Sequence, residues 1–116
     1  MTKLVILCAK FESQEAKKEI LAEMEPFLYK CALMYLPIIK RRIVEMDDLM
    51  ELGHVAILKA IKKYRLDAQM KFSTYAVWCI KRDLRNFVNK QINYYRYIHA
   101  DLDGDGNINY DDEDQR

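Results

Sequence analysis

The sequence predicts an all-α protein, a compact helical bundle of three to four helices followed by an acidic, irregular C-terminal tail. Apolar residues recur at steps of three and four along several segments, and no segment alternates convincingly with a period of two. The 116 residues include only three glycines and two prolines, which favours long helices over tight turns. A chain of this length suits one domain, which we expect over residues 1–100, with the tail over residues 101–116.

The N-terminal segments leave two alternatives open. Residues 1–10 fit either a short strand or a continuation of the first helix. Ser13 can cap a helix whose first turn carries Glu15, since an acid suits the positive end of the helix dipole. Pro26 fits either the first turn of a following helix or a kink in a continuous one.

The segment after Pro26 is predicted to be helical. Its apolar residues share one stripe: Phe27, Cys31, Met34 and Tyr35. We expect Pro37 to end this helix, because proline lacks an amide hydrogen and clashes with the preceding turn.

The next helix is predicted to begin at Asp47 or Asp48, either of which can cap it. Glu51, three residues after Asp48, completes a pattern like a capping box. Seven residues with a period near 3.6 are predicted to face the core: Leu49, Leu52, Ala56, Ile57, Ala60, Ile61 and Tyr64. Residues 65–71 then form a polar connector.

A last long helix is predicted from about Thr74 to Tyr97, with Ser73 as its cap. Its buried stripe is predicted to hold five residues: Ala76, Ile80, Leu84, Phe87 and Val88. The tyrosines near its end, Tyr94, Tyr95 and Tyr97, can stack on DNA or pack against a helix end or a partner.

Charge is unevenly distributed along the chain. Residues 1–100 hold 18 lysines and arginines against 11 acidic residues, whereas residues 101–116 hold one arginine against seven. Within residues 59–96 there are ten basic residues and two acidic ones. A basic face this dense favours a polyanionic partner, and a solvated helical surface is the alternative.

Composition also excludes several classes of protein. The three cysteines, Cys8, Cys31 and Cys79, lack metal-ligand spacing and fit reduced, partly buried thiols. The sequence shows no signal peptide, and its longest apolar run, residues 26–39, is too short to span a bilayer. We find no nucleophile motif, phosphate-binding glycine loop or zinc pattern. We therefore expect a cytoplasmic protein that contacts no membrane and is not an enzyme.

Aromatic and basic residues alternate at helical spacing in the last helix. Tyr75, Trp78, Arg82 and Arg85 fall on one side of it, away from the buried stripe, with Lys71 and Phe72 at its start and Lys81 on its flank. Stacking an unpaired base on an aromatic ring contributes about 1–3 kcal/mol. Basic neighbours would hold phosphates. The alternative is that the two aromatic residues belong to the core, with arginine stems packed beside them.

Two blocks of sequence resemble region 2 of the bacterial sigma-70 family of RNA polymerase initiation factors. Residues 48–61 read DLMELGHVAILKAI, and residues 71–81 read KFSTYAVWCIK. The preceding residues 25–35 are similar to the helix before these blocks, and the resemblance covers roughly residues 20–92.

The resemblance implies two binding surfaces. The first block would dock on a coiled coil in the largest subunit of RNA polymerase core, through Asp48, Met50 and Glu51. The second would recognise and melt the minus-ten promoter element. The residues that carry over to DNA binding are Lys71, Phe72, Thr74, Tyr75, Trp78, Lys81, Arg82 and Arg85.

Each of these DNA-binding residues has an implied role. Tyr75 would stack on the flipped adenine of the single non-template strand, while Phe72 and Trp78 would help to wedge the duplex open. Lys71 and Thr74 would contact the displaced strand. The remaining three, Lys81, Arg82 and Arg85, would hold the backbone or the upstream edge of the duplex.

Some positions depart from the family pattern. Glu51-Leu52 stands where the family has Gln-Glu, Cys79 replaces the second tryptophan, and Arg82 replaces a glutamine, which implies a different promoter preference. A chain of 116 residues leaves no room for a second, helix-turn-helix domain. We therefore expect a stand-alone region 2, half of a two-protein factor whose partner reads the minus-thirty-five element, a divergent phage or mobile-element factor, or a fragment.

The acidic tail resembles an EF-hand or dockerin calcium loop. The candidate ligands are Asp101, Asp103, Asp105, Asn107 and Asp112. We expect no required cofactor and at most weak calcium binding, on the order of 10⁻⁴–10⁻³ M, because too few residues follow for an exiting helix. The alternatives are an acidic linker and a tail that lies on the basic face and competes with DNA.

The sequence therefore favours a sigma-like transcription initiation factor, or its region 2 fragment, with RNA polymerase core and promoter DNA as partners. The alternative hypothesis is a sigma-fold interaction or regulatory module, possibly responsive to calcium, that does not melt promoters.

Overall fold

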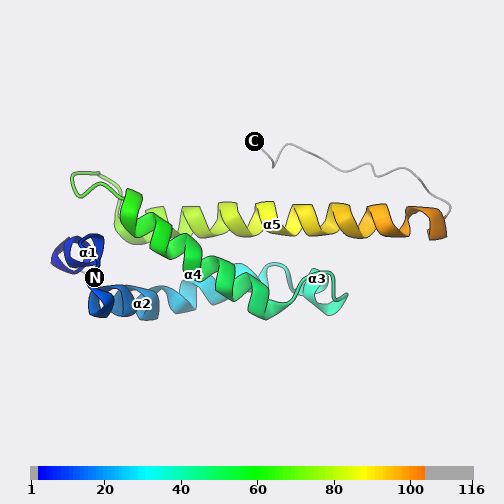
Figure 1. The fold of residues 1–116 in the computed structure, drawn as a ribbon, viewed down its shortest axis with the longest axis horizontal. Helices are drawn as coiled ribbons and strands as arrows, with labels where there is room; N and C mark the ends of the chain where they lie inside the picture. Colours follow the sequence, from blue (N-terminus) through cyan, green and yellow to red (C-terminus); the bar gives the residue numbers. More distant parts are fainter. Residues whose placement is uncertain (1–2, 104–116) are drawn as a thin grey trace.

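The computed structural model describes the backbone of residues 3–103 and the side chains of residues 3–99. The all-α prediction is confirmed, since no strand occurs within this part of the chain. Five helices are present: α1 (Lys3–Lys10), α2 (Gln14–Leu33), α3 (Leu36–Lys40), α4 (Met46–Lys63) and α5 (Phe72–Asp103). In Figure 1, α4 crosses between α2 and α5, and α5 extends past α3 at one end of the molecule.

Both alternatives for residues 1–10 were wrong, because Lys3–Lys10 form a helix of their own, α1. It is separate from α2, and its Ile6 and Ala9 are buried in the core. Ser13 caps α2 as predicted, accepting a hydrogen bond from the Ala16 amide at 3.3 Å. Glu12 reverses the chain direction between the two helices with a positive φ of 69°.

Lys10 fixes α1 to a distant part of the chain. Its Nζ donates to the backbone carbonyls of Ile61 at 3.0 Å, Lys62 at 2.8 Å and Tyr64 at 2.7 Å. These carbonyls lie at the C-terminal end of α4, where backbone acceptors lack partners within the helix and the helix dipole favours a cation. One ammonium group therefore caps α4 and holds α1 against it.

The prediction for the stripe after Pro26 was partly wrong. Helix α2 runs through Pro26 without interruption, so its buried face is set by Ile20, Met24 and Leu28 at steps of four. Phe27 and Met34 fall off that stripe and are exposed, whereas Cys31 is buried as predicted and Tyr35 is half-buried. The helix ends at Leu33, and Pro37 lies in the first turn of α3 instead of terminating α2.

The capping prediction for α4 was wrong, while its core stripe was largely right. The helix begins at Met46, with Glu45 in the cap position and no side-chain cap, so Asp47 and Asp48 lie in the first turn. Met46 is half-buried against the core, which explains the earlier start. The residues predicted to face the core are buried except for Leu52, which is half-buried.

Gly53 allows α4 to approach α2 closely. A Cβ atom at this position would lie 2.1 Å from Leu28 Cδ1, and the Leu28 side chain is fully buried. The close contact of the two helices here therefore depends on the absence of a side chain at Gly53.

Helix α5 begins earlier than predicted and extends further. The Tyr75 amide donates to the Lys71 carbonyl at 3.1 Å, so the helix starts directly after Lys71, and Ser73 is not its cap. Four of the five predicted stripe residues are buried, and Phe87 is half-buried. Helix α5 packs mainly against α4, and this packing fixes the orientation of its opposite face.

The three cysteines are free thiols, with Cys8 exposed and Cys31 and Cys79 buried. Burial raises the pKa of the Cys31 thiol, partly opposed by the charge of Lys81. Within residues 3–103, no helix combines the length and the apolar character needed to cross a bilayer.

Candidate nucleic-acid interface

Four aromatic side chains form a continuous series at the junction of α4 and α5, which we call the aromatic ladder. The ring centroids of Tyr64 and Phe72 lie 5.3 Å apart in an edge-to-face arrangement, and those of Tyr64 and Tyr75 lie 6.0 Å apart. Tyr75 and Trp78 are stacked, with centroids 6.5 Å apart and an interplanar angle of 17°. The ladder runs from buried Phe72, 4% exposed, to Trp78, which is 56% exposed.

Arg82 completes the exposed end of the ladder. Its Cζ lies 4.9 Å from the centroid of the Trp78 ring, within the range of a cation–π interaction. Its Nε also donates to Asp83 Oδ1 at 3.1 Å. These two contacts hold a guanidinium group beside an accessible indole ring, where it can meet a phosphate next to a stacked base.

Tyr75 presents a neutral phenol at physiological pH. Burial raises the pKa of Tyr75 above its ordinary value, and a hydrogen bond with Cys79 raises it further, while the charge of Arg82 acts in the opposite direction. The half-buried ring is held between Tyr64 and Trp78. Its orientation is therefore set by the fold before any ligand binds.

The structure brings some of the predicted DNA-binding residues together and separates others. Tyr75, Trp78 and Arg82 are in contact with one another along the outer side of α5. Phe72 is buried and supports the ladder from inside, so its contact with DNA stays a prediction. The other four lie around this group: Lys71, Thr74 and Lys81 are exposed, and Arg85 is half-buried.

Tyr64 is a ladder residue that sequence reasoning assigned to the core alone. It is the C-terminal cap of α4, and its hydroxyl donates to the Met70 carbonyl at 2.7 Å. This bond spans the connector between α4 and α5 and keeps the Tyr64 ring against Phe72. The signal that could have found it is an aromatic residue at a helix end, directly before the connector to the aromatic–basic stripe.

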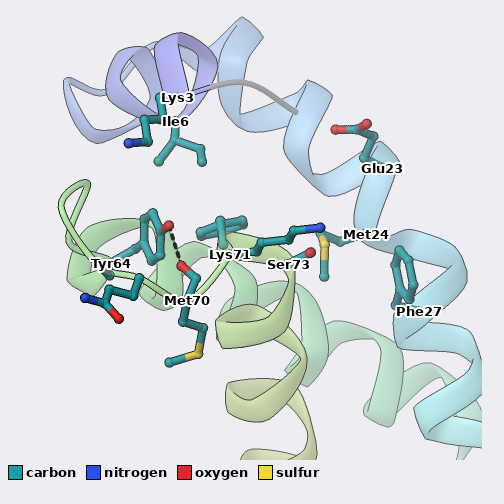
Figure 2. Close-up of a pocket in the computed structure, with 12 residues that line it drawn as sticks. Lys3, Ile6, Glu23, Met24, Phe27, Tyr64, Met70, Lys71 and Ser73 are labelled. Carbon is teal, nitrogen blue, oxygen red and sulfur yellow. Dashed lines mark hydrogen bonds between the residues drawn. The ribbon is translucent and has the colours of Figure 1, made fainter.

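A cavity of about 650 Å³ adjoins the buried end of the ladder (Figure 2). It lies between α1, α2, the 64–71 connector and the start of α5. Its walls combine aromatic and sulfur-containing side chains with lysines: Lys3, Ile6, Glu23, Met24, Phe27, Tyr64, Ala68, Gln69, Met70, Lys71, Phe72 and Ser73. Sequence reasoning did not anticipate this cavity, because α1 and α2 supply one side of it.

The predicted polymerase-binding residues lie on α4, at a separate surface. Asp48 and Glu51 are exposed and line a groove of about 510 Å³ between α4 and α5. Leu52, Val55, Phe87 and Gln91 form the rest of this groove. Met50 is half-buried and lies outside the groove, and the role of all three residues stays a prediction.

His54 adds a contact that sequence reasoning missed. Its Nε2 lies 2.8 Å from Glu25 Oε1, which links α4 to α2 across the surface. The two residues are 29 positions apart, and no local pattern predicts their pairing.

Most of the candidate calcium loop lies outside the described residues. Asp105, Asn107 and Asp112 lie outside the described residues, and the side chains of Asp101 and Asp103 do so as well. Within the described part of the chain, no three histidine, cysteine or acidic side chains gather to hold a metal ion.

The sequence of the chain also matches known proteins. A family model described as Sigma-70 region 2 matches residues 20–93. The chain is 32% identical over 47 residues to RNA polymerase sigma-B factor of Myxococcus xanthus, a match covering 40% of this chain and 19% of that protein. It is 41% identical over 44 residues to RNA polymerase sigma-F factor of Priestia megaterium, covering 38% of this chain and 17% of that protein.

These matches span less than a fifth of the length of either relative. No solved structure matches the chain at a significant level.

Proposed function

Since the chain belongs to the sigma-70 region 2 family, we propose that it acts in transcription initiation by capturing unpaired promoter bases on the outer side of α5. The observation that carries this proposal is the stacked pair of Tyr75 and Trp78 with Arg82 beside it. An exposed ring offers a flat apolar surface to a base, and the guanidinium offers two or more donors to a phosphate.

Melting follows from the balance of two energies. Unstacking and unpairing a base costs a few kcal/mol per step. Stacking on aromatic side chains returns about 1–3 kcal/mol per base, and phosphate contacts add a salt-dependent contribution. A ladder that is already oriented loses little entropy on binding, which favours the open strand over the duplex.

The cavity in Figure 2 extends this binding surface. Lys71 lies on its wall and also beside the exposed part of α5, so a strand leaving Trp78 can pass over it. Aromatic and sulfur-containing walls suit the faces of a base, and the two lysines at the cavity suit phosphates.

The groove between α4 and α5 is proposed as the polymerase-docking surface. Its α4 side carries Asp48 and Glu51, while its floor includes Leu52 and Phe87. An acidic rim around apolar side chains suits a helix with basic flanks and an apolar stripe. We propose that the coiled coil in the largest subunit of RNA polymerase core supplies this helix.

Two assays test the proposal separately. Binding to a single-stranded minus-ten oligonucleotide is measured by fluorescence anisotropy, with Trp78→Ala expected to weaken it and Glu51→Lys expected to leave it unchanged. The second assay is capture of bacterial RNA polymerase core by the immobilised protein. Here Glu51→Lys is expected to weaken capture and Trp78→Ala to leave it unchanged. Core capture without single-strand binding would instead support a sigma-fold interaction module that does not melt promoters.

A further inference from the structure

The inner side of α5 carries apolar residues beyond the part that the rest of the fold covers. Ala76, Ile80 and Leu84 are fully buried on this side. At about 100° per residue, Tyr94 and Ile98 fall on the same side of the helix, yet Tyr94 is 63% exposed and Ile98 is 47% exposed. The stripe that builds the core therefore continues into the end of α5 that extends past α3, where the described part of the chain leaves it uncovered (Figure 1).

A basic residue accompanies the two exposed apolar ones. Lys90 is exposed and lies one turn before Tyr94, so Lys90, Tyr94 and Ile98 follow one another at steps of four. We call these three residues the uncovered stripe. No acidic residue occurs from Leu84 to Ala100. The uncovered stripe is therefore an apolar helix surface with a positively charged flank.

The groove between α4 and α5 has the complementary chemistry. Its α4 rim is acidic, because Asp48 and Glu51 are exposed there, and its apolar lining includes Leu52, Val55 and Phe87. A groove of this kind binds a helix through an apolar stripe, and opposite charges at the rim fix the orientation of that helix. The uncovered stripe has the properties that such a groove selects.

The uncovered stripe cannot enter the groove of its own molecule. Phe87 and Gln91 form the α5 wall of this groove, and α5 is one continuous helix, Phe72–Asp103. Tyr94 lies about 4.5 Å further along the same axis than Gln91, so it can only prolong that wall. A second molecule is needed to bring a stripe into a groove. Two stripes facing each other would juxtapose like charges, so docking of stripe into groove is favoured over docking of stripe on stripe.

We infer that the chain forms a symmetric dimer in which the uncovered stripe of each copy docks in the groove between α4 and α5 of the other copy. Stripe and groove adjoin each other on α5, because Gln91 and Tyr94 are about one turn apart. A two-fold axis between two antiparallel copies of α5 therefore lets both dockings form at once, and the same surface of each molecule is used twice. Tyr94 and Ile98 fill the apolar lining, and Lys90 meets the acidic rim.

The dimer has a consequence for the two binding surfaces. Each groove is filled by the other copy, so the dimer cannot dock on RNA polymerase core, whereas Trp78 on the opposite side of α5 stays accessible to single-stranded DNA. Self-association therefore competes with polymerase docking and leaves base stacking unaffected. This consequence rests on the proposed function, but the dimer itself does not.

The test is sedimentation velocity of the full chain over a range of protein concentrations, without DNA or polymerase. The interface variants are Tyr94→Ala, Lys90→Glu and Glu51→Lys. The matched controls are Tyr29→Ala and Lys18→Glu, which change an exposed tyrosine and an exposed lysine on α2. Circular dichroism establishes that each variant keeps its helix content.

Wild type and both controls should show a monomer–dimer equilibrium that shifts with concentration. Tyr94→Ala should weaken the dimer by about tenfold or more, because a large aromatic side chain is removed from the centre of the interface. Lys90→Glu and Glu51→Lys should each weaken it, because each variant places like charges where a stripe meets a groove. An equimolar mixture of these two charge variants should dimerise more strongly than either alone, because both dockings of the mixed dimer then join opposite charges.

Three results would overturn the inference. One is a wild-type chain that stays monomeric at every concentration, and another is a dimer that Tyr94→Ala leaves intact. The third is a mixture of the two charge variants that is no more dimeric than each variant alone. Failure of the proposed function would look different, because Trp78→Ala would then leave single-strand binding unchanged whatever the sedimentation data show.

Discussion

The inner and outer sides of α5 differ in burial, in chemistry and in what they contact. Ala76, Ile80 and Leu84 on the inner side have no exposed surface and pack in the core. Trp78 on the outer side is 56% exposed and contacts Tyr75 and Arg82. The two sets alternate within the same turns of helix, so stability and DNA binding should respond to different substitutions only a few residues apart.

The largest expected effect is on the inner side. Leu84→Ala should lower the free energy of unfolding by about 2–5 kcal/mol, because it removes buried methyl groups and leaves a cavity. Urea denaturation followed by circular dichroism measures this loss. At low temperature, where the variant is folded, its affinity for single-stranded DNA should equal that of wild type. A lower affinity of the folded variant would contradict the view that the inner side serves stability and the outer side serves DNA binding.

The outer side should show the opposite response. Trp78→Ala should lower the free energy of unfolding by only about 1 kcal/mol, because it removes the contacts with Tyr75 and Arg82 but leaves no core cavity. It should weaken single-strand binding by about 1–3 kcal/mol, as measured by anisotropy at fixed salt. Tyr94→Ala is the matched control, because Tyr94 is also an exposed aromatic residue of α5 but lies away from Trp78 on the helix. Equal losses for both variants would contradict a specific stacking site.

A third substitution lies away from both sides of α5. Lys10→Met should lower the free energy of unfolding by about 1 kcal/mol, since it removes the cation that caps the C-terminal end of α4. Lys18→Met, which removes an exposed charge from α2, controls for net charge. Urea denaturation of both variants gives their unfolding midpoints. Identical midpoints would show that the contacts of Lys10 with the end of α4 do not stabilise the fold.

The smallest expected effect depends on pH. Because the folded pKa of Tyr75 is raised, the unfolded chain releases this proton at a lower pH than the folded chain. Stability should therefore fall as the pH rises from about 10 through the folded pKa of Tyr75 and should be independent of this group at lower pH. Tyr75→Phe lacks the group, so its unfolding free energy should fall less than that of wild type over this window.

The core could be predicted from the sequence because its signal is local. Ile57, Ile61, Ile80 and Leu84 recur with the helical period, and their burial follows directly from it. The cap positions of α4 and α5 were predicted wrongly, because packing of half-buried Met46 and buried Phe72 extends each helix beyond the best capping residue. Capping contributes about 1 kcal/mol, which such packing can outweigh.

The candidate site was predictable on α5 and less so elsewhere. The spacing of Tyr75, Trp78 and Arg82 is short enough for one helix to bring them together. Tyr64 and the contacts of Lys10 depend on chain segments that meet only in the folded protein, with Lys10 and Tyr64 separated by 54 positions. The helical periodicity of a single segment does not indicate which distant segment it will contact. The buried end of the ladder and the adjoining cavity therefore could not be derived from the sequence.

Trp78 is the one tryptophan in the chain, so its fluorescence reports directly on the central claim that the outer side of α5 stacks unpaired bases. Titration with a single-stranded minus-ten oligonucleotide should quench its emission to saturation, and raising the salt concentration should shift the midpoint to higher DNA concentration. Binding detected by anisotropy with no change in Trp78 emission would contradict the claim.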